Sequence, residues 1–136
     1  MLRVLLTVLT FACLLRPGYA AEQNEPTLKL MSFNIRYHNP SDGSNAWPYR
    51  MELVESTIRF HQADVIGMQE VLSDQLIDLT SMLPEYSFVG KPRDSSRAGE
   101  HAAIFYRRNR LHLLDEGTFW LSQTPDIPSR GWDAAL

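Results

Sequence analysis

Cysteine is nearly absent from this sequence of 136 residues, in which Cys13 is the only one. It lies in an apolar N-terminal stretch, so residues 21–136 contain none. The chain after residue 20 therefore has no disulfide, no thiolate nucleophile and no zinc site built from cysteine. These exclusions remove several classes of enzyme and are compatible with an oxidising compartment.

Basic residues are also few: 13 Lys and Arg stand against 16 Asp and Glu, a formal net charge of −3. Without residues 1–20, which hold Arg3 and Arg16, the formal charge is −5. An acidic chain is a poor electrostatic match for non-specific binding to nucleic acid, which needs a basic surface. We therefore expect no stable nucleic-acid partner. The charge suits a protein that recruits cations, although a bound metal ion can reverse the local field.

The longest hydrophobic run is short and lies at the N-terminus. Residues 4–15 are almost continuously apolar after one positive charge at Arg3, and Gly18-Tyr19-Ala20 supplies the small residues of a cleavage site. This layout predicts a secretory signal peptide over residues 1–20, and hence a secreted or periplasmic protein. A retained membrane anchor is the alternative, but spanning a bilayer takes about 20 apolar residues. After cleavage we expect a polar leader at residues 21–27 and no integral membrane segment.

The next part of the chain predicts a strand–helix–strand unit. Strands apolar enough to be buried on both faces are predicted at residues 28–34 and 64–70. Turn-forming residues 39–45 predict a loop, and residues 48–61 predict a helix with an apolar face. This order predicts that the two strands pair in parallel.

The remaining segments predict one more helix and further strands. The helix begins after a cap at Ser73 or Asp74 and stops at Pro84. The strands that follow are close together in the chain, which predicts antiparallel pairing. We expect strands at residues 86–90, 102–106 and 111–121, a loop at 91–99 and a basic hairpin turn at 107–110.

Two polar residues close the strands of the first unit, Asn34 and Glu70. Parallel strands joined by a helix end at the same edge of their sheet, where ligands of open α/β sheets gather. Magnesium takes oxygen ligands, typically one or two carboxylates, waters and phosphate oxygens of a substrate. We therefore predict that Glu70 holds a metal and that Asn34 contacts the metal, its water or a phosphate oxygen. The alternative is that Asn34 caps a turn and Glu70 is a solvated strand end.

Four segments in order resemble a known superfamily: residues 31–36 (MSFNIR), 64–70 (DVIGMQE), 99–107 (GEHAAIFYR), and 117–122 (GTFWLS) with 131–133 (GWD). They are similar to the endonuclease/exonuclease/phosphatase superfamily, and the last resembles its secreted bacterial branch. Members include DNase I-like nucleases, inositol polyphosphate phosphatases, neutral sphingomyelinases and deadenylases. The resemblance covers nearly all of the chain after residue 27.

The resemblance implies an α/β (α+β) fold, the N-terminal half of a DNase I-like four-layer α/β/β/α sandwich. It implies that Glu70 coordinates Mg (or Mn) and that Asn34 lies at the metal–phosphate centre. Glu100 matches the glutamate that orients a catalytic histidine, since a carboxylate fixes the tautomer of an imidazole; otherwise it is a surface glutamate beside a strand. Arg36 could reach a substrate phosphate or form a surface salt bridge. Ala98 replaces a tyrosine of DNase-like members, which puts nuclease-like substrate contacts in doubt.

Members of the superfamily supply a catalytic aspartate and histidine through Asp-x-Asn and Ser-Asp-His-like motifs, and neither occurs here. We therefore expect a truncated metal-dependent phosphoesterase-type domain over residues 28–136, specific for a phosphodiester or phosphomonoester and inactive alone. Its sheet should expose a face that a complete domain covers. The alternatives are a non-catalytic exported binding domain and a truncated gene product without a function of its own. The sequence indicates neither the substrate class nor an oligomeric state.

Overall fold

A computed structural model describes residues 27–94 and 99–132 of the protein. The predicted signal peptide, residues 21–26 of the leader, and Ala98 lie outside these ranges. Within them, none of the helices is long and apolar enough to cross a membrane. The elements in chain order are β1 (Leu30–Asn34), the 3-10 helix η1 (Pro40–Asn45), α1 (Trp47–His61), β2 (Val65–Val71), α2 (Ser73–Met82), β3 (Tyr86–Val89) and β4 (His101–Arg107).

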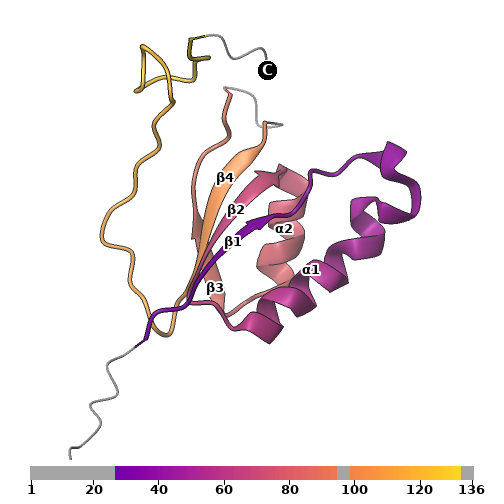
Figure 1. The fold of residues 1–136 in the computed structure, drawn as a ribbon. Coiled ribbons are helices and arrows are strands. Elements are labelled where there is room, and N and C mark those ends of the chain that lie inside the picture. Colours follow the sequence, from indigo (N-terminus) through magenta and orange to yellow (C-terminus); the bar gives the residue numbers. More distant parts are fainter. Residues whose placement is uncertain (1–26, 95–98, 133–136) are drawn as a thin grey trace, which may run out of the picture.

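The strands form one mixed sheet in the order β1-β2-β4-β3. β1 and β2 pair in parallel across helix α1, as the strand–helix–strand order predicts. β4 runs antiparallel to both of its neighbours, so the predicted antiparallel pairing of β3 with β4 is also confirmed. Both helices lie on one side of the sheet (Figure 1). The C-terminal ends of β1 and β2 and the start of β4 therefore meet at one edge of the sheet.

The hydrophobic core lies between the helices and this face of the sheet. Val54 and Ile58 of α1 are buried, which agrees with the apolar face predicted for this helix, and Leu79 of α2 is fully buried. They pack against Ile66 and Phe105 of the central strands β2 and β4. Each such side chain contributes about 1.5–3 kcal/mol by leaving water, so truncating Ile58 or Leu79 to alanine would destabilise the whole layer.

The opposite face of the sheet is open within the described residues. Leu30 of β1 is 71% exposed and Ile104 of β4 is 45% exposed. Exposed and half-buried residues alternate along β1, so the prediction that this strand is buried on both faces is wrong. The physical reason is that β1 is an edge strand and that helices cover only one of its faces. The exposed sheet face itself agrees with the expectation from the sequence.

A short 3-10 helix, η1, occupies residues 40–45 of the segment predicted to be a loop at residues 39–45. Asn39 precedes η1, and its side-chain oxygen accepts a hydrogen bond from the backbone N–H of Ser41 at 3.0 Å. Pro40 opens the first turn, and Gly43, with φ of 58°, joins two turns across a kink. The turn-forming residues that indicated a loop thus serve as the cap and the hinge of a 3-10 segment.

Residues 111–121 do not form the predicted strand. The chain leaves β4 through a turn in which Leu111 N–H donates to the carbonyl of Arg107 at 2.9 Å. Both edges of β4 are already paired, with β2 and with β3, so no edge is free for a hairpin partner. The segment instead runs beside the sheet without a ladder (Figure 1). Leu114 within it is 96% exposed.

Helix α2 begins at Ser73 with Leu72 as its N-terminal cap residue, so the predicted caps at Ser73 and Asp74 are wrong. The side chain of Gln75, the third residue of the helix, accepts a hydrogen bond from Leu72 N–H at 3.0 Å, which is the contact that the third residue makes in a capping box. The helix ends at Met82, two residues before Pro84, as predicted.

A buried carboxylate holds together the end of the sheet far from the site. Asp64, 0% exposed, accepts a hydrogen bond from Lys29 N–H at 2.9 Å. Both of its oxygens also lie 2.7 Å from Nη1 of Arg110, in the turn after β4. The backbone hydrogen bond from Lys29 holds the pKa of this carboxyl below its ordinary value, and Arg110 acts in the same direction against the effect of burial. Asp64 therefore joins the starts of β1 and β2 to the end of β4.

Candidate functional site

Glu70 lies at a β-bulge, one residue before the end of β2 rather than at its last position. Met68 pairs with Ala103 and Val71 pairs with His101, so β2 carries one extra residue there. Glu70 has φ of 61°, a left-handed conformation that is uncommon outside glycine. Regular alternation would point its side chain to the helix-covered face, with Met68. The bulge re-aims it toward the edge of the sheet.

The bulge brings Glu70 into contact with the end of β1. Asn34 Nδ2 donates a hydrogen bond to Glu70 Oε1 at 2.7 Å, and Tyr37 N–H donates to Glu70 Oε2 at 3.2 Å. The hydrogen bond from Asn34 is the main reason that the pKa of the Glu70 carboxyl lies below its ordinary value. The N–H of Tyr37 and the charges of Arg36 and Arg50 lower that pKa further, while burial opposes them. Glu70 is therefore a carboxylate throughout the neutral pH range.

The chain turns sharply after β1. Arg36 has φ of 59°, and its N–H donates to the side-chain oxygen of Asn34 at 2.9 Å. The side-chain amide of Asn34 thus accepts a hydrogen bond from the turn and donates another to Glu70. The sequence-predicted pair, Asn34 and Glu70, is therefore in direct contact, although the assignment of a metal to it stays a prediction.

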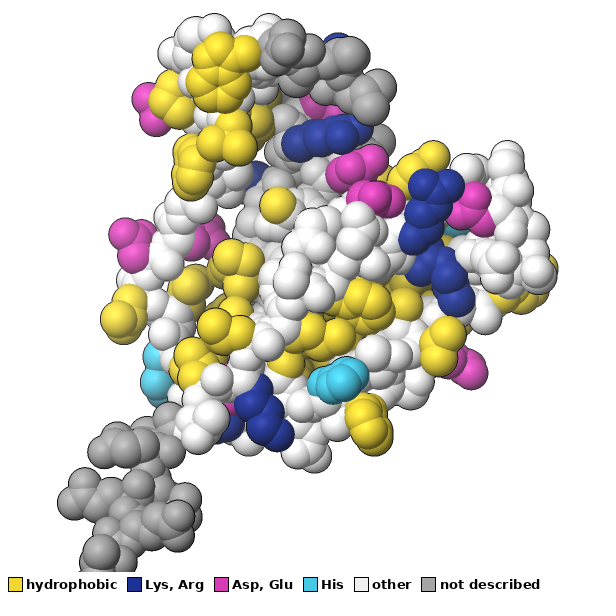
Figure 2. Space-filling view, in the orientation of Figure 1, with side chains coloured by type: hydrophobic (Ala, Val, Ile, Leu, Met, Phe, Trp, Pro, Cys, Tyr) yellow, Lys and Arg dark blue, Asp and Glu magenta, His cyan; other side chains and the backbone are white. Residues whose placement is uncertain are grey.

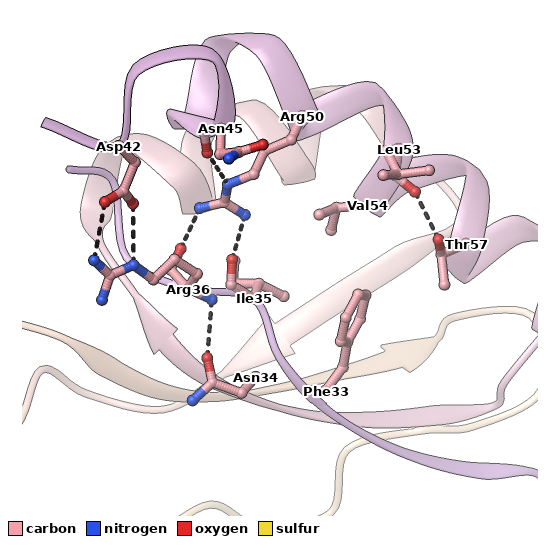
Figure 3. A pocket seen from close by; sticks show the side chains of 10 residues that line it. All are labelled: Phe33, Asn34, Ile35, Arg36, Asp42, Asn45, Arg50, Leu53, Val54 and Thr57. Carbon is pink, nitrogen blue, oxygen red and sulfur yellow. Dashed lines mark hydrogen bonds and ion pairs between the residues drawn. The ribbon is translucent and has the colours of Figure 1, made fainter. Parts of the chain in front are cut away.

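The guanidinium of Arg36 forms a two-pronged ion pair with Asp42 of η1. Nε lies 3.0 Å from Oδ2 and Nη2 lies 3.1 Å from Oδ1. This hydrogen bonding raises the pKa of Arg36 and lowers that of Asp42. Of the two predicted roles, the structure shows the salt bridge, and the contact with a substrate phosphate stays a prediction. Arg36 and Asp42 both line a cleft of about 660 Å³ between β1 and α1. Figure 3 shows the pair among the side chains that line it.

Two residues that the sequence reasoning did not single out contact the same turn. Arg50 of α1 donates to the carbonyls of Ile35 and Arg36, and its Nε donates to the carbonyl of Asn45 (Figure 3). Gln75 of α2, 0% exposed, donates to the carbonyl of Arg36 at 2.9 Å. A polar residue three positions into a predicted helix is the one signal that could have identified Gln75.

Glu100, predicted to orient a catalytic histidine, lies just before β4 at the same edge of the sheet. Its Oε2 lies 3.3 Å from Nη1 of Arg93, and its carbonyl accepts the N–H of Arg93 at 2.9 Å. The partner that the structure shows is thus an arginine in the preceding loop. Glu100 is three-quarters buried on its side-chain surface, and its catalytic role stays a prediction.

The side chains of Glu70 and Asn34 supply only part of the oxygen ligands that a divalent cation such as magnesium needs. Glu70 offers an ionised carboxylate whose two oxygens each accept one hydrogen bond, which leaves lone pairs on both. The amide nitrogen of Asn34 contacts this carboxylate, and its amide oxygen accepts the N–H of Arg36. Magnesium is commonly bound through one or two carboxylates while it keeps several waters. Over residues 27–94 and 99–132, no cluster of three or more His, Cys, Asp or Glu side chains could enclose an ion.

Charged side chains near the site are of mixed sign. On the face shown in Figure 2, acidic and basic side chains lie side by side, with apolar side chains exposed among them. Such a surface attracts a polyanion less than a continuous basic patch would.

Solved structures with a similar fold are endonuclease/exonuclease/phosphatase proteins. The chain superposes on such a protein from Bacteroides vulgatus with a TM-score of 0.76 and 46% identity, over 79% of this chain and 42% of that one. It superposes on a mannosyl-6-phosphatase from Bacteroides thetaiotaomicron with a TM-score of 0.77 and 41% identity, over 81% and 42% of the two chains.

Among curated proteins, an uncharacterized protein of Acanthamoeba polyphaga mimivirus is 28% identical over 112 residues, which are 77% of this chain and 42% of the relative. No protein-family profile matches the sequence. The chain thus spans less than half the length of these relatives. The described fold, a four-stranded sheet with two helices on one face, corresponds to part of theirs.

Proposed function

Because the chain belongs to the endonuclease/exonuclease/phosphatase family, we propose that it carries the metal-holding part of a phosphoesterase site. In this proposal Glu70 binds magnesium or manganese, and Asn34 orients that carboxylate. The single observation that carries the proposal is the 2.7 Å hydrogen bond between the two side chains, at the edge where β1 and β2 end. The substrate is a phosphate ester, either a monoester or a diester.

The chemistry of the residues supports this assignment. A bound divalent cation would polarise a phosphoryl oxygen and stabilise the charge that develops on it. The protein's own contribution is to keep Glu70 ionised, to fix its two oxygens through Asn34 and Tyr37 N–H, and to present them at an open edge. Arg36, half exposed beside them, offers a cation for a substrate phosphate if it leaves Asp42.

A sugar phosphate is the substrate that we favour within the class. The mannosyl-6-phosphatase from Bacteroides thetaiotaomicron, 41% identical over 81% of this chain, supports a phosphomonoester on a sugar. The mixed charge near the site and the net acidic sequence support a small substrate over a nucleic acid.

Calorimetric titration with magnesium chloride tests the proposal. We expect binding by the parent chain, loss of binding in Glu70→Gln, and unchanged binding in the control Glu55→Gln, which instead removes a carboxylate on α1 that pairs with Arg59. Absence of binding in the parent, or equal binding by parent and Glu70→Gln, would refute the metal site.

We further propose that this chain alone hydrolyses little. The contacts of Asn34 and Glu70 in the described residues include no histidine or second carboxylate that could serve as a general base or acid. Release of phosphate from mannose 6-phosphate and from p-nitrophenyl phosphate, with magnesium present, would measure this. Turnover that disappears in Glu70→Gln would contradict the proposed inactivity and support the metal site.

Export remains a proposal that rests on residues 1–20. Expression with and without this segment in a Gram-negative bacterium, followed by fractionation, tests it. We expect the protein outside the cytoplasm and shortened after Ala20 only when the segment is present.

A further inference from the structure

The turn after β1 presents two peptide groups to the site. The N–H between Ile35 and Arg36 donates to Asn34 Oδ1 at 2.9 Å, and the N–H between Arg36 and Tyr37 donates to Glu70 Oε2 at 3.2 Å. Peptide groups are planar, and in the trans form the carbonyl points opposite to the N–H. The direction of each N–H toward the site is therefore fixed by whatever holds the carbonyl on the other side.

Both carbonyls are held by side chains of the two helices. Arg50 donates to the carbonyl of Ile35 and, from Nη2 at 2.5 Å, to the carbonyl of Arg36. Gln75 Nε2 donates to the same carbonyl of Arg36 at 2.9 Å. Figure 3 shows the guanidinium of Arg50 facing these carbonyls while Asn34 lies on the other side of the turn. The two peptide groups are thus contacted from opposite sides by the helices and by the site.

Gln75 is itself fixed. It is fully buried, and its Oε1 accepts the N–H of His38 at 3.2 Å and the N–H of Leu72 at 3.0 Å. A buried amide with both ends hydrogen-bonded has one favourable orientation, because a flipped amide would place donors against donors. Gln75 therefore links the turn after β1 to the start of α2.

We propose that Arg50 and Gln75 are positioning residues, which hold the peptide groups on either side of Arg36 so that their N–H groups fix Asn34 and Glu70. The left-handed conformation of Arg36 needs such support. A non-glycine residue with φ of 59° is strained, and this conformation persists only where the surrounding structure imposes it. Neither residue contacts Glu70 through a hydrogen bond of its own. The link to metal binding rests on the proposed function, whereas the support of the turn does not.

Amide hydrogen exchange measured by NMR tests the inference in Arg50→Lys and Gln75→Met. Lysine keeps the charge but cannot donate to two carbonyls from one planar group. Methionine keeps the length of glutamine without its donor and acceptor. We expect the Tyr37 N–H to exchange about tenfold faster in either variant, while amides in the middle of α1 and of β2 keep their protection. The matched control is Arg59→Lys, since Arg59 also lies on α1 and donates to a carbonyl, that of Met82.

Magnesium titration of the same proteins separates positioning from simple loss of stability. Supporting groups around a metal ligand typically change affinity by about 10- to 100-fold, so we expect a loss of this size at temperatures well below each melting transition. Unchanged exchange of Tyr37, or faster exchange spread evenly over the domain, would overturn the inference. If the parent chain binds no magnesium, the proposed function fails, and the exchange of Tyr37 still decides whether Arg50 and Gln75 hold the turn.

Discussion

Replacing Asp64 by asparagine tests the physical account of the sheet. The substitution keeps the shape of the side chain but removes the charge from a group that is 0% exposed and bonded to Lys29 N–H and to Arg110. Asparagine retains one oxygen and turns an NH₂ toward these donors. Hydrogen bonds to charged groups contribute about 1.5–3 kcal/mol each. The Arg110 side chain is 40% exposed, so water solvates it in the variant and limits the loss.

We therefore expect the free energy of unfolding to fall by about 2–3 kcal/mol at pH 7, which lowers the melting temperature of a domain this small by about 10–20 °C. The pKa of Asp64 is lower in the folded protein than its ordinary value of 3.8. The stabilisation is then fully present above the unfolded-state pKa and is lost as pH falls through the folded-state pKa. The difference in the free energy of unfolding between parent and variant should stay constant from pH 7 to pH 5 and become smaller below about pH 4.

Urea denaturation followed by far-ultraviolet circular dichroism at pH 7, 5 and 3 measures this difference. The control Glu55→Gln breaks an i,i+4 ion pair within α1, whose Arg59 side chain is 45% exposed, and should cost less than about 1 kcal/mol. A loss in Asp64→Asn no larger than that of the control, or a difference that is the same at all three pH values, would refute the reasoning.

Three further outcomes follow from the structure. Asn34→Ala removes the main cause of the low pKa of Glu70, so the pH below which magnesium titration detects no binding should move upward relative to the parent. Tyr86→Phe removes a buried hydroxyl that donates to the carbonyl of Ala63 at 2.6 Å, and urea denaturation should show a loss of about 1–2 kcal/mol. Leu30→Lys changes an exposed side chain on the open sheet face, so stability should shift by less than about 0.5 kcal/mol while binding of a hydrophobic dye decreases.

The parts of the fold that could be predicted from the sequence are those with a strong periodic pattern. The apolar face predicted for residues 48–61 agrees with the burial of Val54 and Ile58 in α1, and the strand–helix–strand order identified the parallel pair. Asn34, the last residue of β1, and Glu70, one residue before the end of β2, were correctly expected to lie together. These features depend on local periodicity and on topology, which a single sequence contains.

The parts that could not be predicted depend on contacts between distant residues. Whether residues 111–121 pair depends on whether an edge of β4 is free, which only the complete sheet order decides. In the sequence, Arg50 looks like an ordinary surface residue and Gln75 like an ordinary residue near a helix start. Only the path of the turn after β1 places the carbonyl of Arg36 where both side chains can donate to it. The bulge at Glu70 leaves no mark in the sequence either, because no glycine stands at its left-handed residue.

Because of the extra residue in β2, the position of the Glu70 side chain depends on an irregularity in the pairing of β2 with β4. Between Met68 and Val71 the strand is one residue longer than the partner segment of β4, and removing one residue there would restore an unbroken ladder. A chain with that deletion should have a more regular sheet, because the strained conformation at Glu70 would disappear. The carboxylate of Glu70 would, however, no longer be directed to Asn34. A single deleted codon would thus exchange the candidate site for a more regular strand.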